Sequence, residues 1–298
     1  MIFKIGSFNC LNFGGQSNKN LDAFYNIITK ENLDIIALQE IKNKYAFKQL
    51  IKHLPNKWKG VCEESVGDYA YIWNSEKFCL AKSEILSSSN PSEYQPRIYK
   101  QYKIDKSTGQ TELRREPYFA RFYPIGGGAP FIEIRIINCH IRFSNGNDNM
   151  LNLGAIAMRQ NEFDVLTKAI YAKEADKRYG TNRPAYTILL GDYNLNLKSS
   201  MRAPYLEEIF EVNDNGNIKR IRTVQSDLTT IKKKTDDEEK FANNYDHFTY
   251  DELRFQDTTI SCSRINAVEK YYKGEYEKYQ KEVSDHVPII MKLNLKKG

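Results

Sequence analysis

The segment ILLGDYN at residues 188–194 begins as an apolar run and ends in a carboxylate and an amide side chain. In an extended chain, successive side chains point to opposite faces, so Asp192 and Asn194 project from the same side. Polar groups at the end of an apolar strand are costly to bury unless they bind a partner. The segment therefore predicts a site at which Asp192 and Asn194 face one common ligand.

Four other segments deliver polar side chains at the end of a strand or immediately before one. These side chains are Asn9 in KIGSFN, Glu40 in DIIALQE, His140 in IEIRIINCH, and Asp285 and His286 in EVSDH. Taken singly, each has an ordinary structural explanation, such as a turn, a solvated carboxylate or a neutral histidine with satisfied hydrogen bonds. Taken together, they supply the oxygen ligands that hard divalent cations prefer and two imidazoles that can transfer protons. The set indicates metal-assisted hydrolysis with an acid–base pair.

The composition is typical of a soluble globular protein. Of the 298 residues, 41% are hydrophobic, and no apolar stretch of the sequence is long enough to cross a bilayer, so we expect no membrane association. The N-terminal MIFKIGSFNC has a strand-like pattern and not that of a signal peptide. Five cysteines, an odd number without metal-ligand spacing, favour reduced thiols and a cytoplasmic location. The formal charge of +6 is compatible with a polyanionic partner.

Hydrophobic periodicity predicts the elements that must position the polar set. Strands are expected over 2–10, 32–41, 69–74, 78–86, 117–123, 131–141, 186–194 and 287–295. Helices are expected after Asn20, across Phe47 to Leu54 and over about 151–173. The Gly-rich PIGGGAP at 124–130 predicts a hairpin between two of these strands.

Helices interleaved with strands, several of which are almost entirely apolar, suggest two packed sheets covered on the outside by helices. We find no linker that divides the sequence, so we expect a single domain over residues 1–298. The stretch at about 213–245 is polar and carries blocks of charge such as KKKTDDEEK. This composition predicts a surface insertion within the domain.

The motifs FNCLNFG, LQE, INCH, GDYN and SDH, in this order over nearly the whole chain, resemble the endonuclease/exonuclease/phosphatase superfamily. The segments LRREPYFARF at 113–122 and NNYDHF at 243–248 are most similar to its deoxyribonuclease I branch. The resemblance implies an α/β fold, a four-layer α/β/β/α sandwich of two mainly antiparallel sheets flanked by helices. It also implies a divalent-metal-dependent phosphodiesterase that uses Mg²⁺, with Mn²⁺ or Ca²⁺ as alternatives.

The same resemblance implies the metal ligands and the histidines. Glu40 and Asp285 match the metal-binding carboxylates of the family, and Asn9 matches a residue close to the metal or the phosphate. His140 and His286 match its two histidines. The sequence does not fix which histidine is the acid and which is the base, nor whether one or two ions take part.

Further motif residues carry expected roles in orientation and in phosphate binding. Asp246 in YDH is expected to orient His286, because a carboxylate fixes the tautomer of an imidazole. Asp192 and Asn194 match the pair that positions the phosphate and the attacking water. Arg115 in REP matches an arginine that grips a DNA phosphate, which a planar guanidinium can bind through two oxygens.

Two positions depart from the deoxyribonuclease I pattern. Gly67 stands where that branch has a glutamate that orients the first histidine, with Asp68 beside it, and Ser65 lies near the position of a tyrosine that stacks in the DNA groove. The motif therefore identifies no residue that orients His140.

The predicted function is a Mg²⁺-dependent endonuclease that acts on double-stranded DNA with little sequence selectivity, since phosphate contacts carry no base readout. One alternative is a phosphatase or phosphodiesterase with the same fold that acts on RNA, inositol phosphate or phospholipid. Another is a catalytically silent nucleic-acid-binding protein, which would be expected to lack one or more of the ligands present here.

Overall fold

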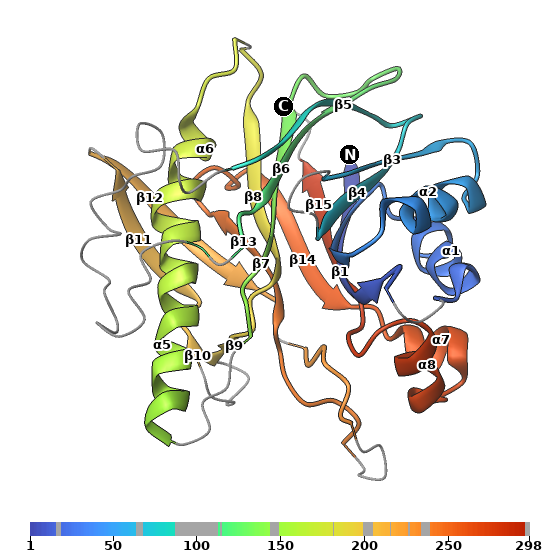
Figure 1. The fold of residues 1–298 in the computed structure, drawn as a ribbon. Helices are drawn as coiled ribbons and strands as arrows, with labels where there is room; N and C mark the ends of the chain where they lie inside the picture. Colours follow the sequence, from blue (N-terminus) through green and yellow to red (C-terminus); the bar gives the residue numbers. More distant parts are fainter. Residues whose placement is uncertain are drawn as a thin grey trace.

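Two β-sheets pack face to face, and helices cover the outer face of each (Figure 1). The computed structural model describes residues 1–15, 19–63, 68–86, 113, 115–143, 149–180, 182–198, 205–214, 216–225, 227–233 and 239–295. Separate apolar clusters lie between the sheets and beneath the helices on either side. The four-layer α/β/β/α sandwich predicted from the sequence is confirmed.

The first sheet has six strands, of which β1 and β2 run parallel and the other neighbours antiparallel. Its order is β14 (Thr258–Arg264), β15 (Ile289–Leu295), β1 (Ile2–Phe13), β2 (Ile35–Ile41), β4 (Tyr69–Asn74) and β3 (Trp58–Cys62).

The second sheet has seven strands, of which only β7 and β8 are parallel neighbours. Its order is β11 (Ile209–Asp214), β12 (Asn217–Val224), β13 (Asp246–Asp251), β8 (Ala185–Asp192), β7 (Glu133–His140), β6 (Tyr118–Pro124) and β5 (Phe78–Ile85). The antiparallel pair of β6 and β7 confirms the hairpin predicted at the Gly-rich turn. Two short strands, β9 (Asn196–Leu197) and β10 (Tyr205–Leu206), pair separately.

Helices lie on opposite sides of the two sheets (Figure 1). The first sheet is covered by α1 (Leu21–Lys30), α2 (Lys44–His53), α7 (Ala267–Tyr272) and α8 (Tyr276–Glu282). The second is covered by α5 (Asn149–Val165), a π-helical segment η1 (Leu166–Tyr171) and α6 (Ala172–Asp176). Asn20 caps α1 as predicted, because its side chain accepts hydrogen bonds from two backbone N–H groups of the first turn. Among the described helices, none combines the length and apolar character needed to cross a membrane.

The layer between the sheets changes from apolar to polar toward one end. Ile5 and Ile136 belong to the apolar cluster there. Further along the same faces, Gln39 Nε2 donates to Ser7 Oγ at 3.1 Å and to Asn138 Oδ1 at 2.7 Å. These three buried polar side chains join the two sheets by hydrogen bonds. The predicted site residues Asn9 and His140 lie two residues further along β1 and β7.

Within the predicted surface insertion, residues 217–224 form β12, which pairs with β11 and β13 in the second sheet. Ile221 packs in the cluster beneath α5. Lys219 is only 1% exposed, and its Nζ lies 2.5 Å from the carboxylate of Asp176, which compensates its charge. A lysine with an ion partner on a helix therefore fills an inward position that the hydrophobic pattern assigned to solvent. The block of lysines at 232–234 is described only as far as Lys233.

A buried ion cluster on the second sheet supplies a stability prediction. Glu133 Oε1 accepts hydrogen bonds from Arg121 Nε at 2.5 Å and Arg135 Nε at 2.8 Å, and all three side chains are buried. Removing one partner of a buried pair leaves an uncompensated charge. We expect Glu133→Gln to lower the free energy of unfolding by about 3 kcal/mol, measured by urea denaturation at pH 7.

The pH dependence of this loss has a defined sign. Burial raises the pKa of Glu133, but hydrogen bonds from Arg121 and Arg135 outweigh it, so the net pKa lies below the ordinary value. The stabilisation is therefore present above the pKa of the unfolded chain and is lost as pH falls through the folded pKa. The exposed Glu207, changed to Gln, is the control, and an equal effect of both substitutions would contradict the argument.

Candidate active site

Strand register places three predicted site residues side by side at one end of the second sheet. His140 on β7 and Asp246 on β13 are both direct pairing partners of Asp192 on β8. Directly opposed residues in neighbouring strands lie on the same face, about 4.8 Å apart in the pairing direction. Gly191 makes the approach of β8 to β7 possible, because a Cβ at this position would lie 1.8 Å from the backbone oxygen of Cys139.

The first sheet contributes Asn9 and Glu40 to the same place. Asn9 Nδ2 donates to Asp192 Oδ2 at 2.9 Å and approaches Glu40 Oε1 at 3.4 Å, so one amide bridges the two sheets. Glu40 has a φ of 61°, which is rare for a residue with a side chain, and its Oε2 accepts from Asn12 N at 2.9 Å. The backbone strain at the end of β2 thus orients this carboxylate toward the site.

His286 is held by its neighbours on both sides of the ring and on the backbone. Its Nδ1 lies 2.8 Å from Asp246 Oδ2, and its Nε2 lies 3.7 Å from Asp192 Oδ2. The hydroxyl of Ser284 accepts from His286 N at 3.1 Å and donates to the backbone oxygen of Asn9 at 2.7 Å. Asp246 Oδ2 therefore accepts a hydrogen bond from His286 Nδ1, which leaves Nε2 directed at Asp192.

His140 is oriented by an arginine and not by a carboxylate. Arg115 Nη1 lies 2.5 Å from His140 Nδ1, and Arg115 Nε lies 3.7 Å from Asp68 Oδ2. Because a guanidinium only donates, Nδ1 must be the acceptor and the ring proton must reside on Nε2. That Nε2 lies 3.6 Å from Asp192 Oδ2. Arg115 thus contacts a predicted catalytic histidine, a contact that the sequence analysis did not anticipate.

Asn194 is fixed by its main chain as well as its amide. Its φ is 51°, and its N–H donates to Asp192 Oδ1 at 2.9 Å. Its Nδ2 donates to the backbone oxygen of Ile141 at 2.8 Å, and its own carbonyl accepts from Arg159 Nη1 at 2.7 Å. The loop after β8 is therefore held by partners from three different segments.

The two imidazoles have opposite electrostatic environments. Burial and the neighbouring Arg115 hold the pKa of His140 well below its usual value. Burial also lowers the pKa of His286, but the carboxylates of Asp246 and Asp192 outweigh this effect and place the net pKa well above the usual value. Burial raises the pKa of the Asp192 carboxyl to about 7. At neutral pH, His140 is neutral, His286 carries charge, and Asp192 can exchange a proton.

Glu40 and Asp285, the predicted metal ligands, both act on one cationic group. Burial lowers the pKa of Lys19, and the charges of Asp285 and Glu40 oppose that effect, so both carboxylates lie within electrostatic range of its ammonium. Among the described residues, no group of three or more His, Cys, Asp or Glu side chains is arranged to hold an ion. Two carboxylates fit Mg²⁺, which proteins bind through one or two carboxylates, with water and substrate phosphate as the other ligands.

The structure thus gathers most of the predicted set around Asp192. The Asp192 carboxylate contacts Asn9, His140, Asn194 and His286. In addition, Asn9 contacts Glu40, His140 contacts Arg115, and His286 contacts Asp246. Asp285 directly precedes His286. Ser65 and Gly67, at which the sequence departs from the deoxyribonuclease I pattern, lie outside the described residues.

Three contributing residues were missed by the sequence analysis. Ser284 was inside the quoted SDH motif, and that motif was the available signal. Tyr69, whose hydroxyl accepts from His140 N at 3.0 Å, and Arg159 carry no motif and reach the site only through the fold.

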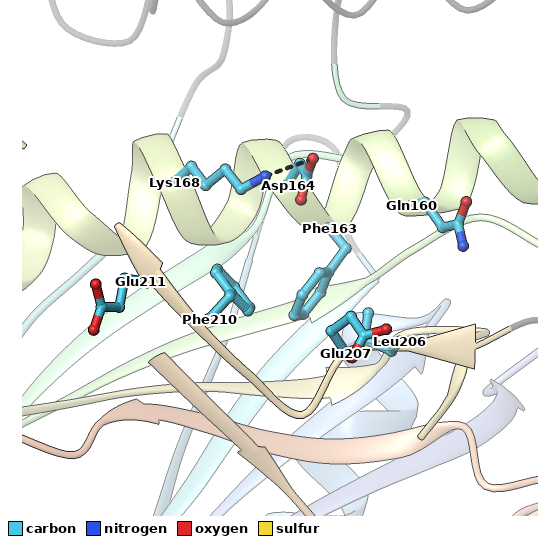
Figure 2. A pocket seen from close by; sticks show the side chains of 8 residues that line it. All are labelled: Gln160, Phe163, Asp164, Lys168, Leu206, Glu207, Phe210 and Glu211. Carbon is cyan, nitrogen blue, oxygen red and sulfur yellow. Dashed lines mark ion pairs between the residues drawn. The ribbon is translucent and has the colours of Figure 1, made fainter. Parts of the chain in front are cut away.

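A groove of about 500 Å³ lies elsewhere, between α5 and the strands β10 and β11 (Figure 2). Phe163 and Phe210 point into it, and Lys168 and Asp164 form an ion pair at 2.8 Å on its helical side. Its lining contains none of the predicted site residues: it consists of Gln160, Phe163, Asp164, Lys168, Leu206, Glu207, Phe210 and Glu211. The predicted chemistry therefore does not belong to this groove.

Solved structures with the same architecture cover nearly the whole chain. An endonuclease/exonuclease/phosphatase from Bacteroides vulgatus has a TM-score of 0.56 at 13% identity, covering 99% of this chain and 100% of that one. TDP2 from D. rerio, complexed with a single-strand DNA product, has a TM-score of 0.56 at 14% identity, covering 98% and 99%. ANGEL2, a 2′,3′-cyclic phosphatase in complex with adenosine-2′,3′-vanadate, has a TM-score of 0.58 at 11% identity, covering 99% and 96%. At these identities the likeness concerns the fold.

Sequence comparison identifies the family. Curated proteins gave no significant match to the sequence. The family model described as Endonuclease/Exonuclease/phosphatase family matches residues 6–207, about two thirds of the chain. That span includes β1, β2, β7 and β8, which carry four of the predicted site residues, and Asn194 in the loop after β8. The chain belongs to the endonuclease/exonuclease/phosphatase family.

Proposed function

We propose that this protein is a divalent-metal-dependent phosphodiesterase that hydrolyses DNA with little sequence selectivity. The observation that carries the proposal is the position of Asp192, whose Oδ2 lies between two imidazole Nε2 atoms at 3.6 Å and 3.7 Å and accepts from Asn9 at 2.9 Å. Members of the family are hydrolases that act on phosphoester bonds. A buried carboxylate surrounded by proton donors suits the hydrolysis of such a bond.

In this proposal, the donors around Asp192 bind the non-bridging oxygens of the phosphate. His286 carries a positive charge, the neutral His140 presents Nε2–H, and Asn9 presents an amide N–H. Donors fixed before the substrate arrives stabilise the negative charge that develops in the transition state. Arg115 contributes indirectly, because it holds the proton of His140 on Nε2.

Asp192 is the group that we assign to the attacking water. A general base is most effective when its pKa lies near the working pH, and burial raises the pKa of Asp192 to about 7. The N–H of Asn194 binds the other carboxylate oxygen at 2.9 Å and fixes the direction of Oδ2. The charged His286 is a poorer candidate for the base, since its proton is retained by Asp246 and Asp192.

Glu40 and Asp285 would hold the Mg²⁺ ion, with Asn9 beside them. A bound divalent cation would supply charge neutralisation to the phosphate and its leaving oxygen. Both residues offer carboxylate oxygens, the hard ligands that Mg²⁺ prefers.

DNA is the proposed substrate for two reasons. The chain carries a formal charge of +6, which favours a polyanionic partner. The D. rerio TDP2 structure of the same fold holds a single-strand DNA product. The rival with a specific observation in its favour is a phosphatase acting on a nucleotide, because ANGEL2 of the same fold is a 2′,3′-cyclic phosphatase.

A supercoiled plasmid with Mg²⁺ tests the proposal. We expect nicked and linear products in Mg²⁺, none in excess EDTA, and recovery when Mg²⁺ is restored. His140→Ala should slow nicking about 100-fold, since it removes one fixed donor to the phosphate. His53→Ala is the matched control, because His53 lies on α2 and pairs with Asp22 outside the site. If supercoiled DNA stays intact with Mg²⁺, Mn²⁺ and Ca²⁺, the proposal is wrong. Hydrolysis of RNA, a cyclic nucleotide, inositol phosphate or phospholipid in its place would assign that compound as the substrate.

A further inference from the structure

An exposed aromatic ring lies immediately beside the candidate active site. Phe143 is 45% exposed and follows His140 by three residues, a span of at most about 11 Å even in extended chain. Between them, the backbone oxygen of Ile141 accepts from Asn194 Nδ2 at 2.8 Å. The segment that carries Phe143 is therefore tied to the loop after β8.

The Phe143 ring is supported from beneath. The guanidinium carbon of Arg159 lies 5.0 Å from the centroid of the Phe143 ring, over one of its faces. The Tyr245 ring lies 6.4 Å away, tilted by 42°. Arg159 and Tyr245 are both buried, and Arg159 also donates to the Asn194 carbonyl. One part of the Phe143 ring thus packs against the buried Arg159 and Tyr245 side chains, while the remainder is exposed to solvent.

The supporting residues adjoin the catalytic carboxylates. Tyr245 directly precedes Asp246, and its carbonyl accepts from Tyr193 N at 2.8 Å. Burial raises the pKa of Tyr245, and while the positive charge of Arg159 opposes that shift, the negative charge of Asp192 adds to it. The Asp192 carboxylate therefore lies within electrostatic range of the group on which Phe143 rests.

We propose that Phe143 is a stacking platform for an unpaired nucleobase of the nucleotide next to the scissile phosphate. The inference rests on the proposed function and adds to it a contact that only single-stranded or locally unpaired DNA can make. Every base has a π face, so stacking on an exposed aromatic ring needs no sequence readout. In a duplex the neighbouring base pairs cover that face, so a paired base cannot stack on Phe143 and the ring would not strengthen binding.

The test is cleavage of an oligonucleotide with one phosphodiester among phosphorothioate linkages, offered single-stranded and as a duplex. We expect Phe143→Ala to lower kcat/KM about tenfold on the single strand, the loss that one base–aromatic stack brings. The loss on the duplex should be less than threefold. Phe143→Tyr keeps a ring and should stay within about threefold of wild type on both.

An abasic series identifies the base that stacks. One base at a time is removed on either side of the scissile bond. At one position, removal of the base should lower kcat/KM of wild type about tenfold. The same removal should leave kcat/KM of Phe143→Ala almost unchanged, because this variant has already lost the contact. Additive losses at every position would overturn the platform.

Phe131→Ala is the matched control. Phe131 is 63% exposed and also has a guanidinium over its ring, that of Arg183 at 4.2 Å. Phe131 precedes β7 and Phe143 follows it, so the whole eight-residue strand, about 23 Å long, lies between them in the chain. Equal losses in Phe131→Ala and Phe143→Ala would also overturn the platform.

Failure of the platform is distinguishable from failure of the proposed function. If wild type cleaves both substrates and Phe143→Ala cleaves them at wild-type rates, the platform is wrong and the phosphodiesterase stands. If wild type cleaves neither with any divalent metal, both proposals fall.

Discussion

Replacing His286 with alanine should lower kcat/KM for DNA cleavage about 1,000-fold. The substitution removes the imidazolium whose pKa the carboxylates of Asp246 and Asp192 hold well above its usual value, against the opposing effect of burial. It therefore removes a fixed positive charge from the proposed phosphate site, together with a proton donor, and such groups contribute about 100-fold to 10,000-fold. Single-turnover cleavage of a labelled oligonucleotide in Mg²⁺ measures the effect.

The partner of His286 gives a graded version of the same test. Asp246→Asn keeps the shape of the side chain but removes the charge 2.8 Å from His286 Nδ1, so a smaller loss is expected, accompanied by a lower histidine pKa in an NMR titration. Asp251→Asn is the matched control, since Asp251 is a buried aspartate at the opposite end of the same strand. A loss below tenfold in His286→Ala would contradict the assigned role.

The architecture was accessible from the sequence because each strand that reaches the site has a strong hydrophobic period. On β7, Ile134 and Ile136 face the inter-sheet core, and Asn138 and His140 continue the same face. The alternation alone thus predicts that His140 points between the sheets. The pairing of β7 with β8 then follows from the packing of two apolar strands, and it brings His140 beside Asp192.

The orientation of His140 was not accessible in the same way. Arg115 lies in the segment just before β6, and its sequence motif REP suggested contact with a DNA phosphate. Its contact with His140 depends on the register of β6 against β7, in which Tyr118 lies opposite Asn138. An arginine side chain can bind either a ligand or a neighbouring side chain, and hydrophobic periodicity does not predict which of the two it binds.

Local backbone geometry was equally hidden. Glu40 directly follows Gln39, which faces the inter-sheet layer, so regular alternation would turn Glu40 away from the site. The positive φ of Glu40 reverses that expectation. The motif LQE located the carboxylate by resemblance, whereas the periodicity alone would have placed it on the wrong face.

Asp192→Asn should abolish cleavage nearly completely, with a loss of 1,000-fold or more in kcat/KM. An asparagine keeps the size of the side chain and can still accept from Asn194 N, but it cannot take a proton from water. The loss should appear in kcat, measured under single-turnover conditions with saturating oligonucleotide, while binding of the oligonucleotide changes little. Circular dichroism and urea unfolding establish that the variant is folded.

The pH profile separates a proton acceptor at Asp192 from a purely structural carboxylate. Burial raises the pKa of this group to about 7, so wild-type kcat/KM should fall as pH decreases below about 7, where the carboxylate takes up a proton and can no longer accept one from water. The residual activity of Asp192→Asn should lack this acidic limb, whereas the control Asp251→Asn should retain it. An unchanged acidic limb in Asp192→Asn would assign the titration to another group and would leave Asp192 as a residue that only positions Asn9 and Asn194.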